Sequence, residues 1–159
     1  MRIAIYIGAL VAILTSCGGS PQTSTSVYME TAKVFDQFEM KKNYDERMES
    51  DLSREVNLLD SLKQEVNVSI ASGDSLNAFK LRKQYYVIER AYNEKYQKLS
   101  TQYTNEVNVR LNEYVKLFAE ENDYDFVMGS SGQGNIMYAK DDLNITEDLI
   151  EFINKKYTN

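Results

Sequence analysis

Few side chains in this 159-residue chain could carry catalysis. The chain has no histidine, which removes the usual acid–base group near neutral pH and the commonest metal ligand. Its carboxylates are spread along long polar segments, and no two of them form a pair in an apolar cleft. The sequence therefore gives no support for general acid–base catalysis. We therefore expect a protein that is not an enzyme and that holds no metal and no cofactor.

Residues 129–135 contain a Gly-x-x-Gly-x-Gly pattern. A phosphate-binding loop requires a helix after the glycines, whereas the β-prone run 136–139 follows them here. We therefore interpret residues 129–135 as a tight turn between two strands, 124–128 and 136–139.

The beginning of the chain resembles the signal of a bacterial lipoprotein. Residues 3–14 form an apolar run that is too short to span a bilayer and fits the core of a signal peptide. The run ends in Leu-Thr-Ser-Cys, which is similar to a lipobox, and Cys17 is the only cysteine of the chain. This resemblance implies that residues 1–16 are removed and that Cys17 is diacylated. The alternative is an ordinary secretory signal that ends near a chance cysteine.

The mature chain that this cleavage would leave is acidic and has a polar tether at its start. Cleavage takes away one of the 18 basic side chains and none of the 24 acidic ones, which leaves a net charge of −7. Residues 17–26 are rich in glycine, serine and threonine and are predicted to be a flexible tether. No acidic residue follows Cys17 closely, and by analogy with lipoprotein sorting this favours the periplasmic face of the outer membrane. No nucleic-acid partner is expected.

The mature chain is organised around Gly73. It separates two segments, 31–72 and 74–128, that contain neither glycine nor proline. In both segments the apolar residues recur about every 3.7 residues, which is the spacing of helices and not of strands. This period exceeds the 3.5 residues of a strict heptad and does not predict a tight left-handed supercoil. We predict two continuous helices, with Thr31 and either Asp74 or Ser75 as N-caps.

The two predicted helices complement each other as an antiparallel hairpin. Residues 33–72 carry a net charge of −3 and residues 74–119 a net charge of +3. Each arm of some forty residues would be roughly 60 Å long, so a hairpin with one apolar stripe must project from the rest of the protein. Residues 27–30 and the two C-terminal runs are predicted strands, and Thr146 is the predicted N-cap of a last helix. Such a small head cannot be stable alone, so we expect it to be completed by oligomerisation.

This order of elements resembles the Skp/OmpH-like family of periplasmic chaperones. The resemblance covers residues 27–157. It rests most on Tyr-Asp-Phe-Val at 124–127, Ile-Met-Tyr-Ala at 136–139, and Asn-Ile-Thr at 144–146. The chain is identified as a member of this family that carries a lipobox. It departs from the family's best-known members, which are soluble and strongly basic, and it has Asn-Ile-Thr where Asp-Ile-Thr is usual.

The resemblance implies a mainly α fold, with a long hairpin tentacle on a small strand-and-helix head that trimerises. The domain would span residues 27–159, with the head at 27–32 and 124–159 and the hairpin at 33–123, its tip at 72–74. The implied function is an ATP-independent periplasmic holdase that binds unfolded outer-membrane β-barrel proteins between three tentacles. The residues expected in the trimeric head are Val27, Met29, Phe126, Met128, Ile136, Tyr138, Ile145, Leu149 and Ile150.

Candidate binding residues lie on the second arm, close to the tip. Six of the twelve tyrosines lie along this arm. We expect them either to pack the seam of the hairpin with exposed hydroxyls or to face the cavity between tentacles. Phe79, Tyr86 and Val87 lie off the apolar stripe and are the preferred cavity residues. Lys80, Arg82 and Lys83 form a basic cluster, interpreted either as a solvated face or as a contact with clients or anionic lipid.

A second class of function is a structural one. A lipid-anchored coiled-coil hairpin could act as a spacer or adaptor that docks one defined partner through its tip. Co-purification of a single partner would favour the adaptor, whereas a trimer that suppresses aggregation of a denatured β-barrel protein would favour the holdase.

Overall fold

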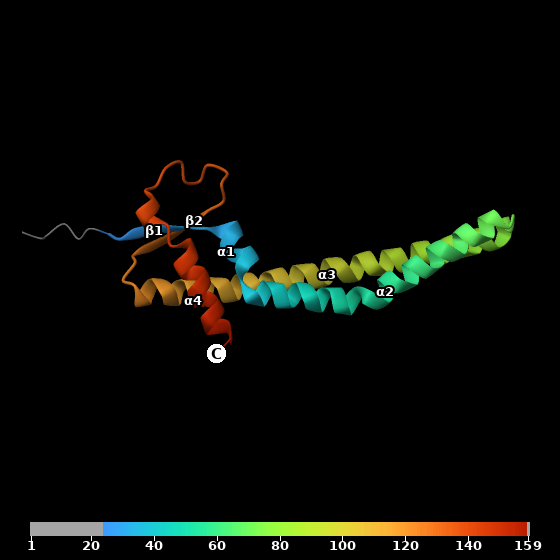
Figure 1. Cartoon of the computed structure of the whole chain (residues 1–159), viewed down its shortest axis with the longest axis horizontal. Coiled ribbons are helices and arrows are strands. Elements are labelled where there is room, and N and C mark those ends of the chain that lie inside the picture. Colours follow the sequence, from blue (N-terminus) through green and yellow to red (C-terminus); the bar gives the residue numbers. More distant parts are fainter. Residues whose placement is uncertain (1–23, 159) are drawn as a thin grey trace, which may run out of the picture.

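The computed structural model describes residues 24–158, and Figure 1 shows their arrangement. Two long helices lie side by side as a projecting hairpin, and a small head sits at its base. The predicted class, mainly α with a long hairpin on a small head of strands and a helix, is confirmed. In chain order the elements are β1 (Ser26–Glu30), α1 (Thr31–Gln37), α2 (Glu39–Ala71), α3 (Ser75–Glu121), β2 (Phe126–Ser130), the short 3-10 helix η1 (Asp141–Leu143) and α4 (Thr146–Thr158).

The hairpin turns at Gly73, which has a φ of +77°. This left-handed conformation strains residues with a Cβ and explains the glycine between two helices. Asp74 caps α3, since its Oδ1 accepts a hydrogen bond from the backbone N–H of Asn77 at 3.0 Å. The prediction of Asp74 or Ser75 as the cap is thereby confirmed, with Asp74 in the role.

The first arm is not one continuous helix, as predicted, but breaks at Phe38. This residue is extended (φ −73°, ψ 121°) and separates α1 from α2 without any proline or glycine. Its ring is fully buried, 6.0 Å from the Tyr114 ring and 5.7 Å from the Tyr157 ring between centroids. Asn154 of α4 bridges the break by accepting from the N–H of Glu39 (2.8 Å) and donating to the C=O of Gln37 (3.0 Å). Tertiary contacts therefore replace the local helix breaker that the sequence lacks.

The first helix also begins without the predicted cap. Thr31 is the first residue of α1, and Glu30, which precedes it, makes no side-chain capping bond. Thr31 instead lies against β2, where a Cβ added to Gly129 would come within 2.5 Å of its Oγ1. Glycine at position 129 therefore lets β2 approach the start of α1 closely.

The seam between α2 and α3 follows a heptad, contrary to the 3.7-residue stripe predicted from apolar residues. From Met48 onward the residues of α2 that are not exposed are separated by alternating steps of four and three, and α3 behaves likewise up to Leu99 apart from Glu89. A 3.5-residue seam favours a left-handed supercoil, and the two helices cross in Figure 1. The seam positions are Met48, Leu52, Glu55, Leu59, Leu62, Val66 and Ser69 on α2, and Ala78, Leu81, Tyr85, Ile88, Tyr92, Lys95 and Leu99 on α3.

Polar residues at three seam positions caused the error in the predicted period. Val56, Ile70 and Tyr96 fit the 3.7-residue spacing of apolar residues and were therefore predicted to face the seam, but they are exposed. Their neighbours occupy the seam instead, because these polar side chains find partners across it. Lys95 Nζ lies 3.1 Å from Glu55 Oε1, and Asn77 donates to the Ser69 hydroxyl at 2.9 Å.

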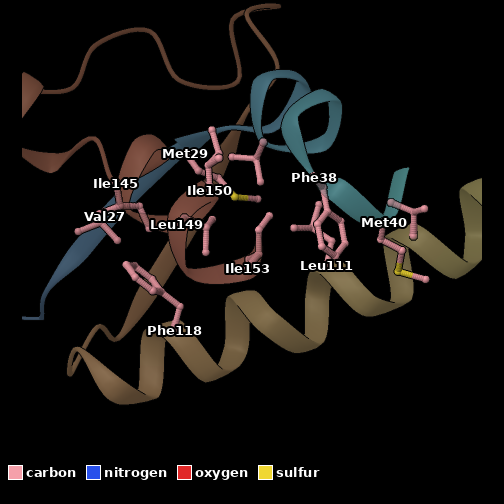
Figure 2. Close-up of a cluster of buried hydrophobic side chains, with 12 residues drawn as sticks. Val27, Met29, Phe38, Met40, Leu111, Phe118, Ile145, Leu149, Ile150 and Ile153 are labelled. Atoms are coloured by element: carbon pink, nitrogen blue, oxygen red, sulfur yellow. The ribbon is translucent and has the colours of Figure 1, made fainter. Parts of the chain in front are cut away.

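The head is built around a core that joins both ends of the chain to the base of the hairpin (Figure 2). Three aliphatic side chains of the core are completely buried: Val34 on α1, and Leu149 and Ile153 on α4. Removing each of them from water contributes roughly 1.5–3 kcal/mol to stability. The core consists of Val27, Met29, Val34, Phe38, Met40, Val107, Leu111, Phe118, Ile145, Leu149, Ile150 and Ile153.

The sheet of the head is smaller than predicted. β1 and β2 pair in parallel with Val27 opposite Val127, so β2 begins two residues later than expected. Residues 136–139 form no strand within the described chain, and the prediction of a β-hairpin there is wrong. The glycine-rich segment is still a turn, closed by Asn135, which accepts from the N–H of Ser131 at 3.0 Å and donates to the C=O of Gly129. Residues 136–139 are β-prone, but a strand also requires hydrogen bonds to a neighbouring strand, and none lies beside them in the described chain.

The last helix begins at Thr146, which is its first residue and not its N-cap as predicted. Asn144 supplies the capping oxygen, because its Oδ1 accepts from the N–H of Thr146 at 3.0 Å. The Thr146 hydroxyl, almost fully buried, accepts from the N–H of Glu30 at 2.9 Å. This contact ties the end of β1 to the start of α4, so the hydroxyl serves the junction between elements and not the helix end alone.

Candidate functional site

The outer section of the hairpin, residues 55–95, is the first candidate surface. Its buried core is small, consisting of Leu62, Val66 and Leu81 with Tyr85 and Ile88 partly covered. A single apolar seam leaves both flanks of the hairpin open, and a groove lies between α2 and α3 on each flank.

One flank carries an almost wholly apolar groove, here called the Leu58 groove. Its volume is about 390 Å³, enough for several side chains. Leu58 and Val87 are 42 % and 62 % exposed, so its walls are open to an incoming chain. No acidic residue lines it. The lining residues are Leu58, Leu62, Lys83, Gln84, Val87 and Ile88.

The opposite flank carries a smaller and more polar groove of about 180 Å³, here called the Arg82 groove. Its lining consists of Lys63, Val66, Asn67, Arg82, Tyr85 and Tyr86. The two grooves share no residue. On α3 the residues 83, 84, 87 and 88 project about 180° from residues 82, 85 and 86 at 100° per residue, which places the grooves on opposite sides of the seam.

The structure therefore separates the binding residues predicted as one group. Tyr86 (65 % exposed) lines the Arg82 groove, and Val87 lines the Leu58 groove. Phe79 is also exposed, with the Lys83 ammonium 4.7 Å from its ring centroid. Arg82 lines the groove with Tyr86, whereas Lys83 lines the groove with Val87, and Lys80 is exposed and lines neither. The basic cluster is thus divided between the two flanks.

Two tyrosines between α2 and α3 near the head make hydrogen bonds through their hydroxyls. Tyr44 stacks on Tyr103 with 4.6 Å between ring centroids. The Tyr44 hydroxyl donates to Glu106 at 2.5 Å, and the Tyr103 hydroxyl donates to Asp51 at 3.0 Å. The hydrogen bond to Glu106 raises the pKa of Tyr44 to about 12, and the same bond lowers the pKa of the Glu106 carboxyl. These tyrosines clamp α2 to α3 and do not form a catalytic group.

The outer face of the β pair is the second candidate surface. Phe126 and Met128 are 61 % and 47 % exposed, whereas Val127 between them packs against the core. Tyr138, in the loop after β2, is almost fully exposed. Alternation along β2 thus points one side chain inward and its two neighbours outward.

The loop that follows β2 also forms an open pocket of about 520 Å³ against β1. Tyr28 and Glu30 line it from β1, and Ile136 and Tyr138 line it from the loop. The other residues predicted for the trimeric head, Val27, Met29, Ile145, Leu149 and Ile150, belong to the core of the single chain. The predicted head set therefore divides into inward residues and a smaller outward group.

Several predictions concern residues or features beyond these two surfaces. Cys17 and the lipobox lie outside the described residues. Within residues 24–158 no group of histidine, cysteine or acidic side chains could hold a metal ion. No helix in that part of the chain is long and apolar enough to cross a membrane.

Leu58, which lines the Leu58 groove from the first arm, was not among the predicted binding residues. Leu58 lies off the apolar stripe of its arm just as Val87 does on the second arm. The same criterion applied to both arms would have found it. The loop residue Met137, which is 89 % exposed, offered no comparable signal, because it was assigned to a strand that does not form.

The fold is thus a coiled-coil hairpin with an open groove on each flank, carried by a small head with an apolar outer face. Residues 26–153 match the family model described as Outer membrane protein (OmpH-like), and the chain belongs to this family. The family is one of non-enzymatic periplasmic chaperones, which confirms the expectation that the protein is not an enzyme. No curated protein matches the sequence.

Proposed function

We propose that the protein is an ATP-independent periplasmic holdase for unfolded outer-membrane β-barrel proteins. The observation that carries the proposal is the pair of open grooves on the outer hairpin, with exposed apolar side chains on both flanks. Membership of the OmpH-like family supports it, since that family consists of periplasmic chaperones. Many weak apolar and tyrosine contacts would hold a client without fuel, and release would follow when the client reaches a better-folded state.

The working form would be a homotrimer whose three hairpins surround the client. The exposed side chains of Phe126, Met128 and Tyr138 support this assembly, because an apolar face of this kind is typical of a protein interface. Within the described chain β2 pairs with β1 alone, so its other edge could accept a strand from a neighbouring copy. Residues 136–139 are the natural candidates for that strand.

A lipid anchor at Cys17 would hold the head close to the outer membrane. The tether would be shorter than the predicted residues 17–26, because β1 begins at Ser26. The proposal keeps the domain at residues 27–159 and the signal peptide at 1–16. It predicts that Cys17→Ala moves the protein from the membrane fraction to the soluble periplasmic fraction. A membrane-bound Cys17→Ala variant would contradict the anchor but not the chaperone.

The deciding experiment measures the mass of the mature protein with and without an unfolded β-barrel protein. We expect a trimer that binds the client and suppresses its aggregation on dilution from denaturant. A monomer with no effect on aggregation would overturn the proposal.

An adaptor function has one observation in its favour. Val68 and Leu76 beside the turn are 69 % and 66 % exposed, which gives the tip an apolar surface for one defined partner. Replacing both with serine would abolish capture of that partner if the protein is an adaptor. The same change would leave aggregation suppression nearly intact if the grooves carry a holdase function.

A further inference from the structure

The two flanks of the outer hairpin differ in chemistry, and this difference restricts what fits between two hairpins. The Leu58 groove is lined by four aliphatic side chains and has no acidic residue. The Arg82 groove offers Lys63, Arg82 and the exposed Tyr86. Among the described residues neither Lys63 nor Arg82 makes an ion pair, so both cations are available to a bound chain.

Cyclic symmetry brings unlike flanks together. In a ring of identical subunits each contact is heterologous, so one side of a subunit always faces the other side of its neighbour. The two grooves lie on opposite sides of the seam. In the proposed ring these two flanks face the neighbouring hairpins, so that the gap between two hairpins has the Leu58 groove on one wall and the Arg82 groove on the other. This step rests on the proposed trimeric holdase.

An extended chain with alternating side chains matches such a gap. Successive side chains of a strand point to opposite faces, so alternation of apolar and polar residues gives one apolar and one polar face. The strands of membrane β-barrels alternate in this way. Lys63 and Arg82 favour acidic side chains on the polar face. Burial and the nearby carboxylates of Glu89 and Asp60 raise the pKa of Tyr85, but neither carboxylate lines the groove.

We propose that neighbouring hairpins bind extended segments in which apolar residues alternate with acidic or neutral polar ones, with the apolar side chains in the Leu58 groove and the polar ones against the Arg82 groove. The order of residues in a client segment, and not its composition alone, then determines how well it is held. Segments that alternate apolar with basic residues are held less well.

The test uses the full mature protein with Cys17→Ser, so that no acyl chain competes for the grooves. Three fluorescent peptides are compared by anisotropy: leucine alternating with aspartate, the same residues in two blocks, and leucine alternating with lysine. We expect the alternating acidic peptide to bind at least about fivefold more tightly than either of the others. The blocked peptide misplaces one or two leucines, which has an effect of that size, and the lysine peptide meets the like charges of Lys63 and Arg82.

Variants of each groove test which kind of side chain it binds. Leu58→Ser with Val87→Ser should weaken binding of all three peptides by about tenfold, whereas Val109→Ser, which removes an equally exposed valine from the inner section, should not. Lys63→Glu with Arg82→Glu should reverse the preference in favour of the lysine peptide. Equal binding of the alternating and blocked peptides, or no reversal, overturns this inference. If the protein is then still a trimer that suppresses aggregation, the proposed function stands, whereas a monomer overturns both.

Discussion

The head and the outer hairpin are stabilised in different ways. In the head, side chains from β1, α1, α4 and the base of the hairpin meet in one core. The buried Thr146 and the partly buried Asn154 link separate elements through hydrogen bonds. In the outer hairpin only three residues form a buried cluster, and the flanks remain open. Local opening costs least where few apolar contacts are buried. The protein thus combines a firmly packed head with a less tightly packed arm, which suits the proposed holdase function.

The largest difference should appear when the same truncation is made in both regions. Leu149→Ala removes a completely buried side chain from the head and should lower the free energy of unfolding by about 2–5 kcal/mol. Leu62→Ala in the outer hairpin should lower it by less than about half as much, because half-covered neighbours can collapse into the space. Urea denaturation followed by circular dichroism measures both. Equal losses would show that the two regions are packed alike.

A second prediction concerns the break between α1 and α2. Asn154→Ala leaves the N–H of Glu39 and the C=O of Gln37 without their partner and should cost about 1–3 kcal/mol. Asn93→Ala, at an exposed position of α3, is the matched control and should change stability little. If both variants unfold at the same urea concentration as the wild type, Asn154 does not hold the break.

The tyrosine clamp near the head makes a smaller, pH-dependent contribution. Because the pKa of Tyr44 is raised from 10.0 to about 12, the folded protein holds this proton more tightly than the unfolded chain does. The Tyr44–Glu106 hydrogen bond therefore makes its full contribution to the free energy of unfolding below pH 10. This contribution is lost as the pH rises towards about 12. Tyr44→Phe should lower the free energy of unfolding by about 0.5–1.5 kcal/mol at neutral pH. The variant should also lose less stability than the wild type between pH 10 and about 12. A pH profile identical to that of the wild type would contradict the clamp.

The smallest effect is expected at the polar seam position between the two regions. Lys95 and Glu55 are partly exposed, so their ion pair contributes little after screening by solvent. Lys95→Met should change the free energy of unfolding by less than about 1 kcal/mol and make it less dependent on salt. Leu99→Met, at the neighbouring seam position, controls for side-chain size. A loss of several kcal/mol would mean that the ion pair is essential to the hairpin.

The sequence alone determined the class of fold. One glycine between two long segments free of glycine and proline, each with helical spacing, is compatible with little else than a hairpin. Local chemistry limited the cap of α3 to Asp74 or Ser75, and the structure shows Asp74 in the role. The order of elements was enough to indicate the family. The exposure of Phe79, Tyr86 and Val87 also followed from their places off the apolar stripe.

Tertiary structure decided what depends on partners distant in the chain. The break at Phe38 has no local breaker, and it exists because the ring enters a core formed with Tyr114 and Tyr157, with Asn154 bonding both helix ends. The heptad seam was hidden because Glu55 and Lys95 take seam positions only when they face each other. Residues 136–139 have β propensity, but a strand also needs a neighbour, which no local pattern supplies. The division of the predicted binding residues between two grooves likewise required both helices to be in place.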